Sequence, residues 1–290
     1  MAPASDTWPP RDHAGFIAAL ERAEAAFSGR VWLGSAQPCS RRPGDPPLRI
    51  HARPRFNLLM AGTRRVVSSV CGHRDAHRAE PGDVHLWAAE AYAAEAVTDR
   101  FELLGVVFHP RHLRVLWVSS DGRSRPGTTP YFVHTASVAG AALAVMRSLE
   151  ALAARGDPTQ AAPDLLRGLL RLLRAHLLAD QQPRRRGAAA TWARVRAHLE
   201  EHVGEPLDRD DVAAAYGLSA SYLSELCRRE HGTRGFRGAV EAIRIERAQC
   251  LLRRDDLSVK QVAVLCGFAS EAYFGRVFKK VVGVSPGRWR

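Results

Sequence analysis

The chain has 290 residues, enough for two domains, and its 46% hydrophobic and 25% charged residues are typical of a globular protein. No apolar run approaches the roughly 20 residues that span a bilayer, and the N-terminus lacks a signal-peptide pattern, which together predict a cytoplasmic protein without a membrane segment. The formal net charge of +12 favours an anionic partner, and a generally Arg-rich composition accounts for the excess equally well. The cysteines show neither a CxxC pair nor zinc-finger spacing, so we expect buried thiols.

The first half of the chain predicts a helix followed by strands. Residues 14–27 form an amphipathic helix candidate. From residue 31 to 134, short apolar runs alternate with Gly, Pro and Arg, which predicts a small antiparallel barrel or sandwich. The clearest runs are residues 31–33, 56–60, 66–67, 84–87 and 101–108. We interpret residues 73–82 as a polar connection and residues 119–129 as a loop.

Two helices are predicted next, at residues 137–154 and 163–179. Paired leucines make the second helix apolar over a wide arc, so it needs burial on more than one side. Packing on its own domain is one way to bury this face, and packing on a second copy of the chain is the other. Residues 181–190 contain Pro, Gly and an arginine run, and they predict a linker. The predicted domains are therefore residues 1–180 and 191–290.

The last part of the chain contains a helix-turn-helix pattern. Ser258 and Gln261 form a capping box that opens a helix, and Gly267 ends it in a left-handed turn. Ser270 then caps a second helix whose apolar residues recur at i, i+3, i+4 and i+7. An ordinary helical hairpin in some other domain has the same local pattern, so this unit alone leaves both readings open.

The same pattern occurs once upstream, which favours DNA binding. Residues 207–217 align with residues 257–267 at an offset of 50, and after the turn the offset is 51. Asp208 caps the first copy and Gly217 is its turn glycine. Between the copies, residues 239–252 contain no Gly or Pro and predict one connecting helix of about 20 Å at 1.5 Å per residue. Two reading helices on such a spacer fit successive major grooves, about 34 Å apart.

Residues 191–290 resemble the DNA-binding domain of AraC/XylS-family transcription regulators. The resemblance rests on Arg244-Ile-Glu-Arg-Ala248 with Leu251-Leu252, and on the C-terminal signature from Val262-Ala through Gly267-Phe and Tyr273-Phe to Arg290. It implies a sequence-specific regulator of double-stranded promoter DNA that more often activates than represses, works with RNA polymerase and is not an enzyme.

The family motif also implies which side chains meet DNA. The base readers implied for the first reading helix are Ser221, Ser224 and Glu225, and those for the second are Glu271, Ala272 and Arg276. Arg and Lys set affinity by phosphate contacts, and the expected contacts are Arg228, Arg229, Lys279 and Lys280. Arg suits guanine, and a carboxylate suits cytosine.

Ahead of such a module, the predicted strands resemble the cupin-like sensor domain of the same family. This resemblance implies an α+β protein, with a β-barrel and following helices before an all-α domain. It also implies a possible small-molecule effector, with no cofactor required. The helices after such a barrel further imply a homodimer formed through residues 137–179, and we expect Leu169 and Leu173 in the subunit contact. The alternative is an N-terminal metalloenzyme fused to the DNA-binding module. Metal cupins present an HxH pair, which this chain lacks, although His73, His77 and Glu80 lie close together in sequence.

Overall fold

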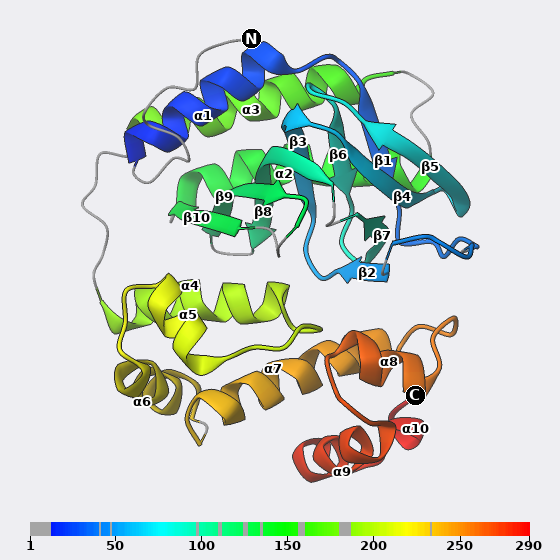
Figure 1. Ribbon diagram of the computed structural model, residues 1–290, viewed down its shortest axis with the longest axis vertical. Helices are drawn as coiled ribbons and strands as arrows, with labels where there is room; N and C mark the ends of the chain where they lie inside the picture. Colours follow the sequence, from blue (N-terminus) through cyan, green and yellow to red (C-terminus); the bar gives the residue numbers. More distant parts are fainter. Residues whose placement is uncertain are drawn as a thin grey trace. The chain divides into compact units, whose positions relative to one another are not determined.

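The computed structural model describes residues 13–40, 42–46, 48–96, 99–109, 112–123, 127–133, 136–155, 160–179, 187–232 and 234–290. The chain divides into two compact units, Met1–Gln182 and Pro183–Arg290. The first unit combines strands and helices, and the described part of the second is helical (Figure 1). The α+β class predicted from the sequence is therefore confirmed.

The larger sheet of the first unit has six strands in the order β1-β6-β3-β8-β9-β10. All neighbours are antiparallel except β1 and β6, which pair in parallel. A bulge interrupts the β3–β8 register between Leu59 and Ala61. The strands are β1 (Val31–Gly34), β3 (Arg55–Gly62), β6 (Val84–Trp87), β8 (Arg100–His109), β9 (His112–Asp121) and β10 (Gly127–Val133).

The smaller sheet has four antiparallel strands in the order β2-β7-β4-β5. These strands are β2 (Leu48–His51), β4 (Arg64–Val70), β5 (His73–Ala79) and β7 (Ala91–Glu95). Apolar residues from both sheets form one buried cluster, which includes Leu59, Trp87 and Leu103 of the larger sheet and Val66 and Ala93 of the smaller one. The two sheets therefore pack face to face.

Three helices cover the other face of the larger sheet: α1 (His13–Ala26), α2 (Ala136–Arg155) and α3 (Ala162–Ala179). α1 and α3 lie side by side in Figure 1, and Arg171 of α3 forms an ion pair with Glu24 of α1 at 2.7 Å. Leu169 and Leu173 are 0% and 2% exposed inside this layer. They are core residues of the unit, which corrects the expectation that they form a subunit contact.

Three sequence expectations for this unit are wrong. The sheets do not close into a barrel: among the described residues they meet at Ser35, whose N–H donates to Ser69 O at 2.7 Å and whose carbonyl accepts from Tyr92 N at 3.2 Å. Residues 73–79 are strand β5 rather than a connection, because they pair along the whole of β4. Strands β9 and β10 occupy both ends of the predicted loop at 119–129.

The second unit contains seven described helices, with α7 running between two groups of shorter ones (Figure 1). α4 begins at Ala188, inside the predicted linker, and residues 181–186 of that linker lie outside the described part. Among the described helices, none is long and apolar enough to cross a bilayer. The helices are α4 (Ala188–Glu201), α5 (Arg209–Ala215), α6 (Ala220–His231), α7 (Phe236–Leu251), α8 (Val259–Leu265), α9 (Glu271–Val282) and α10 (Pro286–Trp289).

Candidate nucleic-acid interface

The first helix pair consists of α5 and α6. The Asp208 side chain accepts hydrogen bonds from two backbone N–H groups in the first turn of α5. Gly217 (φ +64°) forms the turn after α5, and the Ser219 side chain then accepts from Tyr222 N at the start of α6. Gly232 (φ +65°) ends α6. Each helix end thus has a local partner for its free backbone groups.

The second helix pair, α8 and α9, repeats this order of caps and glycines. Ser258 and Gln261 form a complete capping box before α8, as the sequence predicts. Gly267 (φ +75°) forms the turn, the Ser270 side chain caps α9, and Gly283 (φ +90°) ends it. The sequence repeat therefore corresponds to a repeated local structure.

The two pairs have different cores. Cys227 of α6 is fully buried in an apolar cluster, where burial raises the pKa of its thiol to about 11. In α9, the equivalent position holds Phe278, which contacts Phe274 at 5.5 Å and Trp289 at 6.2 Å between ring centroids. Cys266 is also buried, but Cys250 is exposed, which contradicts the expectation that every cysteine is buried.

Arg244 of α7 connects the segment before the first pair to the turn of the second. Its guanidinium donates to Val203 O at 3.1 Å and to Glu205 O at 2.9 Å, and it lies over the Phe268 ring at 5.9 Å. Burial lowers the pKa of Arg244 from its ordinary value. The two carbonyls lie in the loop between α4 and α5, so one side chain joins three parts of the unit.

Near Arg244, the backbone of the loop between α4 and α5 lies close to the backbone of the turn between α8 and α9. A Cβ on Gly267 would lie 2.6 Å from Val203 O and 2.8 Å from the Arg244 guanidinium, and a Cβ on Gly204 would lie 2.7 Å from Leu265 O. A Cβ on Gly217, by contrast, would have nothing within 4 Å of it. Only glycine therefore satisfies both the left-handed backbone and the close approach at residue 267.

The residues predicted to read DNA lie on the outer faces of α6 and α9. Nine of the ten are exposed, and Ser224 is partly buried. They are Ser221, Ser224, Glu225, Arg228 and Arg229 on α6, and Glu271, Ala272, Arg276, Lys279 and Lys280 on α9. Each helix thus presents its predicted readers near its N-terminal half and its basic residues in its last turn.

The predicted readers of the two helices have different surroundings. Glu225 accepts hydrogen bonds from Nε and Nη2 of Arg228 at 2.9 and 2.6 Å. Arg276, at the equivalent position of α9, lies over the Tyr273 ring at 5.9 Å. The first helix therefore presents a carboxylate where the second presents a guanidinium, and two such faces suit different bases.

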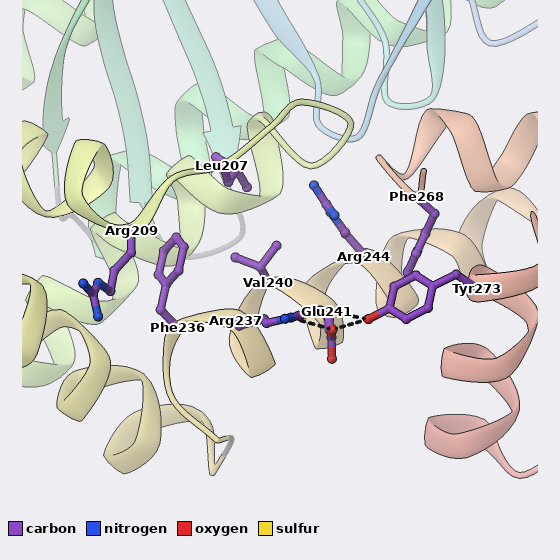
Figure 2. Close-up of a pocket in the computed structure, with 9 residues that line it drawn as sticks. All are labelled: Leu207, Arg209, Phe236, Arg237, Val240, Glu241, Arg244, Phe268 and Tyr273. Atoms are coloured by element: carbon purple, nitrogen blue, oxygen red, sulfur yellow. Dashed lines mark hydrogen bonds and ion pairs between the residues drawn. The ribbon is translucent and has the colours of Figure 1, made fainter. Parts of the chain in front are cut away.

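A pocket of about 310 Å³ lies between the two pairs, along α7 (Figure 2). Apolar side chains including Phe236 and Phe268 line it together with three arginines. At one edge, the Tyr273 hydroxyl donates to Glu241 Oε1 at 2.7 Å. Neither this contact nor the Arg244 contact is predicted by the sequence, although Arg244 and Tyr273 both belong to the motif that resembles the family.

A histidine pair lies between the two sheets of the first unit. His77 Nε2 and His85 Nε2 are 2.8 Å apart, and His77 Nδ1 is 2.8 Å from Asp75 Oδ2. The Trp32 ring is nearly parallel to both imidazoles, at centroid distances of 4.3 and 5.3 Å. Burial, with His77 and Arg64 nearby, holds the pKa of His85 well below its usual range.

This pair differs from the metal site considered in the sequence. His73 is exposed, and Glu80 forms an ion pair with Arg30 instead of approaching His77. Within the described residues, no group of three or more His, Cys, Asp or Glu side chains is arranged to hold a metal ion.

Comparisons with known proteins agree with the geometry of the second unit. A family model described as a helix-turn-helix domain matches residues 212–290. The chain is 36% identical over 114 residues to the HTH-type transcriptional regulator YijO of Escherichia coli, covering 39% of this chain and 40% of YijO. It is 27% identical over 270 residues to the E. coli HTH-type transcriptional regulator YpdC, covering 90% of this chain and 88% of YpdC.

One solved structure, a transcriptional regulator from Chromobacterium violaceum with an AraC-type DNA-binding domain, is 27% identical and has a TM-score of 0.33. This similarity covers 34% of the present chain and 88% of that one. With two capped helix pairs and helix-turn-helix regulators as relatives, the chain is a DNA-binding transcription regulator. Its second unit carries a helix-turn-helix domain of the AraC type, as the signature from Val262 to Arg290 implied.

Proposed function

We propose that the chain binds promoter DNA at a two-part site and activates transcription in response to a small effector. The observation that supports this most directly is the repeated local geometry: α5–α6 and α8–α9 have the same order of cap, left-handed glycine, cap and terminal glycine. Each pair exposes a basic face on its second helix, and the net charge of +12 favours an anionic partner.

In the proposed complex, α6 and α9 lie in successive major grooves. α7 has 16 residues, and such a helix is about 24 Å long at 1.5 Å per residue. Ser221, Ser224 and Glu225 read one half of the site, and Glu271, Ala272 and Arg276 read the other. Arg228, Arg229, Lys279 and Lys280 contact phosphates, which set the affinity without selecting the sequence.

The first unit is proposed to be a cupin-like sensor that also forms a homodimer in the cytoplasm. Because Leu169 and Leu173 are buried, a subunit contact on α3 has to use other side chains. Leu172 and Leu178 are 37% and 51% exposed on this helix and are the proposed contact residues. The effector and a contact with RNA polymerase follow from the family resemblance.

Selection of bound sequences from random DNA with the full chain tests the proposal. We expect one asymmetric motif with two blocks about 10 base pairs apart, and a binding constant that falls steeply with salt. Arg276→Ala and Glu225→Ala should each relax a different block. Failure to enrich any sequence, or a single symmetric block, would contradict the proposal.

A further inference from the structure

The N-terminal turn of α9 is joined to α7 by three side chains, which we call the α7–α9 tie: Arg237, Glu241 and Tyr273. The Tyr273 hydroxyl donates to Glu241 Oε1 at 2.7 Å, and Arg237 Nε donates to the same carboxylate oxygen at 3.4 Å. Arg237 Nη2 also donates to the Tyr273 oxygen at 3.5 Å. Figure 2 shows the three side chains meeting at Glu241.

The tie leads directly to a predicted base reader. Tyr273 is the third residue of α9, and the Arg276 guanidinium lies 5.9 Å from the centre of its ring. The Tyr273 ring also contacts the Phe268 ring, at 6.2 Å between centroids. Because Tyr273 is fixed at its hydroxyl by α7 and at its ring by Phe268, the end of α9 that carries Glu271 and Arg276 has a defined position on α7.

Within the described part of the first helix pair there is no equivalent arrangement. Tyr222 occupies the position of Tyr273, but its side chain is exposed, and among the described residues its hydroxyl has no hydrogen-bond partner. α6 is joined to α7 by residues 232–235, whereas α9 is reached from α7 only through residues 252–270. Because this connection is longer, the position of α9 relative to α7 depends on side-chain contacts such as the tie.

We infer that Tyr273 is a positioning residue that fixes the distance and rotation between the two reading helices, and so selects the spacing of the two halves of the DNA site. This inference rests on the proposed two-part DNA recognition. Inserting one base pair moves one half-site by about 3.4 Å and rotates it by about a tenth of a turn. A tied α9 cannot follow that movement without breaking the bond between Tyr273 and the Glu241 carboxylate. Without the bond, α9 accommodates the altered spacing.

The experiment uses the full chain and the site selected for the wild type. Binding is measured to that site, to versions with one base pair inserted or removed between the halves, and to DNA with only the second half. Tyr273→Phe removes the hydroxyl and keeps the ring, and Tyr222→Phe is the matched control. A bond to a charged group corresponds to a factor of about 10 or more, so we expect Tyr273→Phe to reduce the spacing discrimination by about tenfold. Tyr222→Phe should keep the wild-type ratio.

A merely structural role for Tyr273 predicts equal weakening at all spacings, and that result would overturn the inference. Unchanged spacing discrimination in a folded Tyr273→Phe variant would overturn it as well. If Tyr273→Phe does not fold, Glu241→Gln tests the inference instead. This variant weakens the same hydrogen bond from α7, so it must also reduce the spacing discrimination. If the wild type selects no two-part site, the proposed function fails instead, before the tie is tested.

Discussion

The α5–α6 and α8–α9 pairs share their caps and left-handed glycines, yet they differ in what surrounds them. The turn at Gly217 is open, whereas the turn at Gly267 contacts Val203 O and Arg244. α9 is fixed to α7 by Tyr273, and α6 lacks that bond among the described residues. A sequence repeat thus reports the local structure of each copy, while the contacts between copies give the second one constraints that the first lacks.

Substitutions of the two turn glycines should give the largest difference in stability between the two helix pairs. Gly217→Ala and Gly267→Ala both place a Cβ on a left-handed residue, at a cost of about 1–2 kcal/mol. Gly267→Ala also forces a clash with backbone, and overpacking adds about 1–3 kcal/mol. We expect losses of about 1–2 kcal/mol for Gly217→Ala and about 2–5 kcal/mol for Gly267→Ala. Hydrogen exchange of the most protected amides in each pair measures both, and equal losses would remove the distinction between the turns.

The next largest expected effect is a loss of stability on substitution of Arg244. Arg244→Met keeps most of the apolar stem but leaves the carbonyls of Val203 and Glu205 without this donor. Both contacts are part-buried, and a buried acceptor left unsatisfied costs about 1–3 kcal/mol, so we expect a loss of about 1–3 kcal/mol. Arg209→Met, at a side chain that is 50% exposed, is the control. Urea unfolding of the full chain measures both variants, and similar midpoints would show that the Arg244 contact is dispensable.

The reading faces predict a difference in sequence choice. Glu225→Ala and Arg276→Ala should each cost about 1–3 kcal/mol on the selected site and relax one base pair, in different halves. Lys280→Ala, by comparison, should weaken all sequences alike and reduce the salt dependence by about one phosphate contact. Binding to single-base variants at several salt concentrations separates the two behaviours. Uniform weakening by Arg276→Ala would make it a phosphate contact.

The smallest effect concerns pH. His231 of α6 packs on Trp192 at 5.5 Å, while α9 has Val282 at the equivalent position. Burial, with Arg196 nearby, lowers the pKa of His231 below its ordinary value near 6.5. The unfolded chain therefore binds a proton more readily, and the contribution of His231 to stability is present above about pH 6.5 and is lost as the pH falls below it.

Hydrogen exchange at pH 7 and pH 5, with His231→Gln as the control, measures this loss in the first pair. We expect the wild type to lose protection in α6 relative to the variant. A variant that loses as much protection as the wild type would show that His231 does not contribute.

Local patterns in the sequence predicted local structure well. The Ser258 capping box, the Asp208 cap and the left-handed Gly267 are confirmed because each depends on residues within one turn of the chain. The connecting helix was predicted from the absence of Gly and Pro, and it is α7.

Contacts between distant residues were beyond such patterns. β5 is polar and was interpreted as a connection, because its pairing with β4 and the contact between His77 and His85 follow only from the assembled sheets. Tyr273 and Glu241 are 32 residues apart, and nothing local marks them as partners. The DNA-facing role of Ser221, Ala272 and the other readers stays a prediction, since it depends on a partner.

The contact between His77 and His85 determines which ring nitrogens carry a hydrogen. Two Nε2 atoms at 2.8 Å share one hydrogen, because two N–H groups cannot point at each other. With both rings neutral, His77 Nδ1–H donates to Asp75, so His77 Nε2 accepts from His85 Nε2–H. The hydrogen bond between His77 and Asp75 on β5 therefore fixes the tautomer of a buried ring on the opposite sheet.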